Sequence, residues 1–172
     1  EPFADRVYVA RLRGLADELG LRDRVRFVGA LPYGDMPLWL NLAALSVMVP
    51  RSDGMPNSLW EAMACGAVPV LNRLPQYAEL ITDGENGWFA GPTPNELAET
   101  LVSALADPSE RDRMARRNRE IVLARGHQDR EMDAMERWYE TLAEGGTAPA
   151  PVEANQGKDA QLPCAGSPGS LS

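Results

Sequence analysis

Short apolar runs alternate with amphipathic segments along most of this chain. The apolar runs have the length of strands buried on both faces of a parallel sheet, and the amphipathic segments repeat their apolar positions every three or four residues, as helices do. Expected strands cover residues 24–31, 45–49, 68–71 and 88–90. Expected helices cover residues 4–19, 36–43, 57–65, 76–81, 95–106, 109–124 and 128–143. This order predicts an α/β fold with a parallel sheet. Asn86 and Gly87 are expected to supply the positive φ values of the tight turn before the last strand.

The chain is organised around residues 49–71, where an apolar run leads into a loop of small residues and then into a helix. Asn57 or Ser58 can cap that helix, and Gly66 can take the positive φ at which helices often stop. With the strand at 68–71, the stretch forms a βαβ unit whose loop lies at the carboxyl end of a parallel strand. Ligands of open α/β sheets bind in that crevice, and the amides at a helix start favour an anion such as a diphosphate.

The carboxyl-terminal part of the chain contains one more helix and a segment without periodicity. Four apolar side chains share a face of the last expected helix: Met132, Met135, Tyr139 and Leu142. We interpret this stripe as a face packed on the helix's own domain rather than as part of a cofactor site. Residues 145–172 are rich in Gly, Pro and Ser and are expected to form a disordered tail. The folded domain is therefore expected to comprise residues 1–144.

Composition and charge exclude several classes of partner. The 172 residues are 44% hydrophobic and 24% charged, as in an ordinary globular domain, and the net charge of −8 argues against a nucleic-acid surface. Five arginines nevertheless cluster between residues 111 and 119, among acidic neighbours. A solvated, ion-paired helix face is the favoured interpretation, and a contact with an anionic membrane surface is the alternative. No apolar run reaches the roughly 18 residues of a membrane span, and two cysteines are too few for the disulfide framework of a small secreted domain, which fits the cytoplasm.

Other kinds of active site find little support in the residues. Cys65 lies inside an expected helix with no histidine close in sequence, so a small buried residue is the favoured interpretation over a nucleophile. His127 is the only histidine, at a helix boundary, where a capping or surface role is expected. The residue spacing matches no zinc site and no Asp-x-Asp pair for a divalent metal, so neither a metal nor a cofactor is expected.

The central stretch resembles a known family of enzymes. Its run Asp-Gly-Met-Pro-Asn-Ser-Leu-Trp-Glu-Ala-Met-Ala-Cys-Gly, from Asp53 to Gly66, is followed by Val68-Pro69-Val70 and later by Asp83-Gly84-Glu85-Asn86-Gly87. As a set these motifs, over residues 20–140, resemble the nucleotide-sugar binding domain of retaining GT-B glycosyltransferases of family 4. The resemblance implies a Rossmann-like sheet with helices on both faces, the carboxyl-terminal half of a GT-B fold. The family has two glutamates separated by seven residues, and Asp53 stands where the first is expected.

The resemblance assigns roles in donor binding to the central stretch. Helix-start amides of Asn57, Ser58 and Leu59 would face the diphosphate, and Glu61 would accept hydrogen bonds from the ribose hydroxyls. The spacing of Ser58 and Glu61 alone also fits a capping box, in which the glutamate would bond back to the cap amide. Leu31 would border the base.

Asp53 would hold hydroxyls of the donor sugar, and Gly54 and Met55 would add backbone contacts. Because aspartate is one methylene shorter than glutamate, its carboxylate sits roughly 1.5 Å further back, which changes the hydroxyl it can reach. A plain turn at Asp53 and Gly54 is the alternative.

The resemblance begins inside the second of two GT-B domains. The first domain is expected to be absent, together with the first two strands of the second domain, so no catalytic residue is assigned in this chain. The expected function is donor binding in the transfer of a sugar, with retention, from a UDP- or GDP-linked donor to a glycan or lipid-linked acceptor, as in cell-envelope polysaccharide synthesis. The full enzyme would work in the cytoplasm, at the inner face of the membrane where the acceptor is lipid-linked. The alternative is a non-catalytic nucleotide-binding or protein-interaction module.

Overall fold

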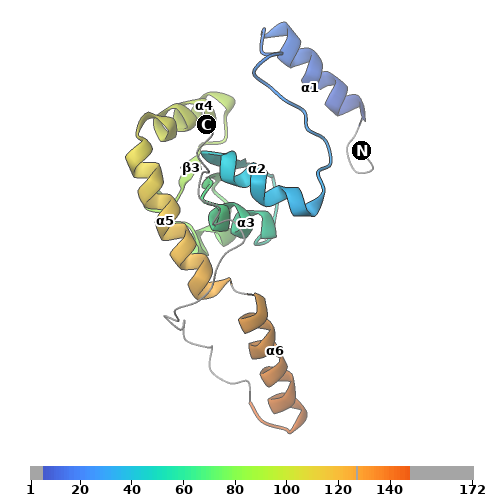
Figure 1. Ribbon diagram of the computed structural model, residues 1–172, viewed down its shortest axis with the longest axis vertical. Helices are drawn as coiled ribbons and strands as arrows, with labels where there is room; N and C mark the ends of the chain where they lie inside the picture. Colours follow the sequence, from blue (N-terminus) through green and yellow to red (C-terminus); the bar gives the residue numbers. More distant parts are fainter. Residues whose placement is uncertain (1–5, 127, 148–172) are drawn as a thin grey trace, which may run out of the picture. The chain divides into compact units, whose positions relative to one another are not determined.

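The computed structural model describes residues 6–126 and 128–147 (Figure 1). The chain divides into two compact units, one ending at Met36 and one beginning at Pro37, and each is described by itself. His127 and most of the expected tail lie outside the described residues. The boundaries expected at residues 144 and 145 remain predictions.

The amino-terminal unit consists of one helix followed by an irregular segment. Helix α1 covers Arg6–Glu18, and Gly20 follows it with a φ of 67°. A 3-10 turn, Tyr33–Asp35, ends the unit.

The strand predicted at residues 24–31 is wrong. The backbone of residues 25–29 forms no strand, and the side chains of Val25, Phe27 and Val28 are 39% to 46% exposed. A strand is completed by hydrogen bonds from a neighbouring strand, and none of the described residues pairs with this segment. Its apolar sequence is therefore not sufficient to make it a strand here.

The second unit is built on a three-stranded parallel sheet. Helix α2, Met36–Leu42, leads to strand β1, Leu45–Met48, which pairs with β2, Val68–Asn72, which in turn pairs with β3, Trp88–Ala90. In the register, Val47 lies opposite Val70, and Val70 lies opposite Trp88. The helices at residues 57–65, 94–106 and 108–125 pack on this sheet (Figure 1), so the predicted Rossmann-like architecture is confirmed.

Helix α3, Asn57–Cys65, connects β1 to β2 and ends as predicted at Gly66, whose φ is 89°. Its predicted start is wrong in one respect. Pro56 is the N-cap residue, and no side chain caps the helix, so neither Asn57 nor Ser58 does. The Ser58 hydroxyl instead donates to the Met48 sulfur at 3.5 Å, because the helix begins one residue before the serine.

The core of the second unit lies between α3, the sheet, the segment 75–81 and the helix at residues 108–125. A 3-10 turn, Pro75–Glu79, precedes β3; helix α4, Pro94–Ala106, packs on β3, and helix α5, Pro108–Arg125, packs on α3. The core side chains are Leu59, Met63, Leu71, Tyr77, Leu80, Ile81 and Val122. Cys65 is also buried, as predicted.

The turn before β3 differs from its prediction. Gly84, not Asn86 or Gly87, has the positive φ, at 76°. Asn86 is buried and hydrogen-bonded to Asn118 of α5. Gly87 is required for a different reason, since a Cβ atom there would lie 2.9 Å from the backbone oxygen of Pro69. The tertiary contacts of these residues therefore determine their conformation.

The arginines of α5 bond mostly to the chain's own backbone. Arg119 donates to the carbonyls of Ala64 and Cys65, at the end of α3. Further bonds run from Arg111 to the Ala104 carbonyl and from Arg113 to the carbonyls of Gly84 and Glu85, and Arg117 pairs with Glu85 at 2.9 Å. Most of this cluster therefore holds other elements of the unit.

Helix α6, Gln128–Ala143, carries the predicted apolar stripe, but the stripe is not packed as expected. Its four members are 40% to 67% exposed, so the described residues leave much of the stripe uncovered. Only Ala134 of this helix is buried. Across the described residues, no helix is both long enough and apolar enough to cross a membrane.

Candidate functional site

The predicted donor-binding residues of the central stretch lie in the loop after β1 and in the first turns of α3. This loop begins at the carboxyl end of a parallel strand, the edge at which open α/β sheets bind ligands. The structure therefore brings Asp53, Gly54, Met55 and the start of α3 together, as the sequence predicted. Leu31 belongs to the amino-terminal unit, so its proximity to these residues stays a prediction.

Asp53 is held by three hydrogen bonds at the tip of the loop. One carboxylate oxygen, Oδ1, accepts from the Gly54 amide at 2.8 Å, and Oδ2 accepts from the Tyr77 hydroxyl at 3.1 Å. The Asp53 backbone oxygen accepts from the side-chain amide of Gln76. The loop is thereby joined to the 3-10 turn Pro75–Glu79, which sequence reasoning did not connect with it.

Tyr77 is the buried partner in this network. Its side chain has no exposed surface, and it belongs to the core cluster. Burial, reinforced by the hydrogen bond and the charge of Asp53, raises the pKa of Tyr77 to about 12. The phenol therefore remains protonated at neutral pH and donates to the carboxylate.

The start of α3 presents fewer amides than the sequence suggested. The Leu59 amide donates to the Pro56 carbonyl at 3.0 Å, and the Leu59 side chain is fully buried in the core. The amides of Asn57 and Ser58 have no acceptor among the described residues. Two amides thus point out of the helix end, where the helix dipole favours an anion.

Glu61 lies one turn into α3 and is half-buried. The capping-box interpretation of Ser58 and Glu61 is wrong, because the serine is not the N-cap residue. Met55 packs its side chain against the core, which leaves its backbone for contact with a ligand.

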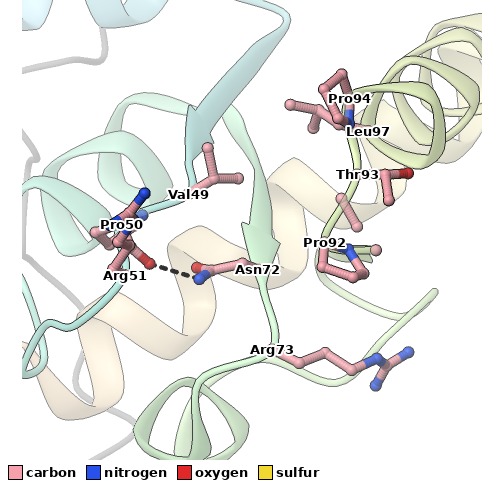
Figure 2. A pocket seen from close by; sticks show the side chains of 11 residues that line it. Val49, Pro50, Arg51, Asn72, Arg73, Pro92, Thr93, Pro94 and Leu97 are labelled. Atoms are coloured by element: carbon pink, nitrogen blue, oxygen red, sulfur yellow. Dashed lines mark hydrogen bonds between the residues drawn. The ribbon is translucent and has the colours of Figure 1, made fainter.

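A pocket of about 660 Å³ opens at the carboxyl ends of all three strands (Figure 2). Its lining comprises Val49, Pro50, Arg51, Asn72, Arg73, Ala90, Gly91, Pro92, Thr93, Pro94 and Leu97. Figure 2 shows the Asn72 side chain pointing to Pro50, whose carbonyl accepts from the Asn72 amide at 2.5 Å. No predicted donor-binding residue lines this pocket, and sequence reasoning missed it. The sequence signal that could have predicted the pocket is the set of residues at and just after the carboxyl end of each strand.

No group of three or more His, Cys, Asp or Glu side chains in the described part of the chain is arranged to hold a metal ion.

A family of known proteins is similar to this chain over the residues that contain the site. A sequence model described as "Glycosyl transferases group 1" matches residues 5–121. The chain is 32% identical over 102 residues to a D-inositol 3-phosphate glycosyltransferase of Frankia alni, covering 59% of this chain and 25% of the relative. It is 29% identical over 108 residues to a GDP-mannose:cellobiosyl-diphosphopolyprenol alpha-mannosyltransferase of Xanthomonas campestris, covering 63% and 28%. The chain spans about a quarter of the length of the curated relatives it matches.

Solved structures agree in fold. The carboxyl-terminal domain of a group 1 glycosyl transferase from Francisella tularensis has a TM-score of 0.61 at 23% identity, covering 70% of this chain and 63% of that domain. Anabaena HepE in complex with UDP-glucose has a TM-score of 0.71 at 25% identity, covering 83% of this chain and 38% of HepE. Since the family model matches more than half of the sequence and the fold is that of the carboxyl-terminal half of a GT-B enzyme, the chain belongs to the group 1 glycosyl transferases.

Proposed function

We propose that this chain is the donor-binding part of a retaining glycosyltransferase, which transfers a sugar from a UDP- or GDP-linked donor to a glycan or a lipid-linked acceptor. The observation that carries the proposal is the Asp53–Glu61 stretch, with an anchored carboxylate and two unbonded amides at the carboxyl edge of a parallel sheet. The names of the relatives support it, because they include an inositol phosphate glycosyltransferase and mannosyltransferases that use GDP-mannose. HepE, of similar fold, is described with UDP and with UDP-glucose.

Each part of the donor has a candidate partner. The amides of Asn57 and Ser58, with the dipole of α3, stabilise the diphosphate, whose negative charge grows as its bond to the sugar breaks. Glu61 accepts hydrogen bonds from the ribose hydroxyls. Asp53 accepts hydrogen bonds from the sugar.

The complete enzyme requires a second domain. Catalysis needs the donor and acceptor to be enclosed and oriented between two walls, and this chain supplies one of them. The exposed stripe of α6 is suited to pack on the amino-terminal domain of the full-length parent. Val47, 44% exposed on β1 at the edge of the sheet, is suited to lie beside the two additional strands that the resemblance implies. With a lipid-linked acceptor, the parent works in the cytoplasm at the inner face of the membrane.

The proposal is tested in the full-length parent by titration calorimetry with UDP, GDP, UDP-glucose and GDP-mannose. We expect Glu61→Ala to weaken nucleotide binding by about 1.5 kcal/mol or more, the cost of hydrogen bonds to a charged group. Glu99→Ala, at an exposed position of α4, is the matched control and should leave binding unchanged. Equal affinities for the parent and the Glu61 variant would contradict the ribose assignment. Retention is tested by NMR of the product, whose anomeric configuration should equal that of the donor.

A further inference from the structure

We propose that Tyr77 is a positioning residue for donor-sugar recognition, holding the Asp53 carboxylate in the orientation that receives the sugar hydroxyls. The inference rests on the proposed function and adds a residue that lies 24 positions from Asp53 in sequence. It also commits to a ligand class, a nucleoside-diphosphate hexose with free hydroxyls on its ring.

Asp53 is held more firmly than an exposed aspartate in a loop usually is. A surface aspartate in a loop ordinarily rotates freely, because water satisfies its oxygens equally well in several rotamers. Here two separate donors fix the carboxylate, the Gly54 amide on Oδ1 and the Tyr77 hydroxyl on Oδ2. Gln76 fixes the Asp53 backbone as well. Both the loop and the side chain are therefore set before any ligand arrives.

The position of Tyr77 explains why it can act in this way. Its ring is fully buried in the core cluster that also contains Leu59 and Met63 of α3, so the hydroxyl is a fixed donor rather than a mobile one. Leu59 belongs to the same helix start whose amides face the donor diphosphate in the proposed function. The Tyr77 ring thus shares a core with the diphosphate-binding helix, while its hydroxyl holds the sugar-binding carboxylate.

The remaining hydrogen-bonding capacity of Asp53 points to hydroxyl groups. An ionised carboxylate accepts about four hydrogen bonds, two on each oxygen. With one site on each oxygen occupied, one acceptor site remains on each. Asp53 itself remains exposed to solvent, so a ligand can reach these sites. Two acceptors at the separation of carboxylate oxygens suit two neighbouring hydroxyls of a hexose.

Fixing the carboxylate also has an energetic consequence for recognition. A side chain that is already oriented loses less rotamer freedom when ligand binds, so more of each hydrogen bond appears as affinity. This effect applies to the sugar alone, because Asp53 does not contact the nucleotide in the proposed arrangement. The sugar's contribution to affinity is therefore the quantity that Tyr77 should control.

The test compares nucleotide with nucleotide sugar in the full-length parent, using UDP against UDP-glucose and GDP against GDP-mannose. The measured quantity is the dissociation constant of the nucleotide divided by that of the nucleotide sugar, so a larger ratio means that the sugar adds more affinity. Tyr77→Phe keeps the buried ring and removes only the hydroxyl. We expect it to reduce that ratio about tenfold, the equivalent of one charge-assisted hydrogen bond, with the affinity for UDP and GDP alone unchanged.

Two further variants make the result decisive. Tyr8→Phe, at an exposed position of α1, should leave both affinities unchanged. In an Asp53→Ala background, Tyr77→Phe should have no further effect on the ratio, since the group it positions is gone. Equal loss of nucleotide and nucleotide-sugar affinity would show a purely structural role and overturn the inference, as would an unchanged ratio. If the parent binds none of the four ligands, the proposed function fails and the inference with it. A reduced ratio in Tyr77→Phe, together with no effect of Glu61→Ala on nucleotide binding, would support the role of Tyr77 and contradict the ribose assignment of Glu61.

Discussion

The buried pair of asparagines behind the turn before β3 should contribute much of the stability of the second unit. Asn118 of α5 donates to the Asn86 backbone oxygen at 2.8 Å, and its own side-chain oxygen accepts from the Asn86 side-chain amide at 3.0 Å. Asn86 also accepts from the Thr82 amide at 2.7 Å and donates to the Leu80 carbonyl at 3.1 Å. Both asparagines are at most 1% exposed. We therefore expect Asn118→Ala to be strongly destabilising.

The magnitude follows from the two bonds that this change removes. Asn118→Ala leaves the Asn86 carbonyl and one of its side-chain N–H groups without a partner in a buried position. Each such group costs about 1–3 kcal/mol, so the free energy of unfolding should fall by about 2–6 kcal/mol. A whole domain is stable by only about 5–15 kcal/mol, so the loss is a large fraction of the total.

Urea denaturation followed by circular dichroism measures the change, with the midpoint and the slope fitted separately. Asn95→Ala, at an exposed position of α4, is the control and should change stability by less than about 0.5 kcal/mol. The double variant with Asn86→Ala should be less destabilised than the sum of the single variants, by about 0.5–3 kcal/mol, since the two side chains share a bond. A loss below about 1 kcal/mol for Asn118→Ala, or full additivity, would refute the reasoning.

Three further predictions concern the end of α3, Tyr77 and the chain by itself. Gly66→Ala should destabilise the chain by about 1–2 kcal/mol, because φ at this position is 89° and the new Cβ would lie 2.6 Å from the Arg119 guanidinium. The control, Gly14→Ala inside α1, has open space around the new Cβ and should stabilise the chain by about 0.5–1 kcal/mol. The midpoint of urea denaturation measures both changes. Because the pKa of Tyr77 is raised to about 12 from 10.0, its contribution to stability is complete below pH 10 and is lost as the pH rises to 12. Denaturation midpoints should therefore fall more steeply with pH over this range in the unsubstituted chain than in Tyr77→Phe. Parallel curves for the two proteins would contradict the raised pKa of Tyr77. Calorimetry on the 172-residue chain alone should give nucleotide-sugar dissociation constants in the high micromolar range or weaker, because the chain supplies only one wall of the site. A dissociation constant below about 1 μM, or sugar transfer by the chain alone, would show that reasoning to be wrong.

Local sequence signals were sufficient for the centre of the fold. The apolar runs at Leu45–Met48 and Val68–Asn72, with the helix between them, form the expected βαβ unit. Gly66 ends the helix because only glycine adopts a positive φ without steric cost, which is a property of the residue itself. The same stretch contains the motif from which the family and most candidate donor-binding residues were predicted. Periodicity and single-residue geometry act over a few neighbours, so they can be read along the chain.

The tertiary structure decided what depends on partners distant in sequence. The segment 24–31 has the composition of a strand but no strand, because its hydrogen-bonding neighbours would have to come from elsewhere. Asn86 looked like a turn residue and is a buried partner of Asn118, 32 residues away. Tyr77 gave no sign in sequence of holding Asp53, since only the packing of the 3-10 turn against the loop brings the hydroxyl and the carboxylate together. Hydrogen bonds between distant segments are made by the assembled core, and no local pattern encodes which side chains will meet there.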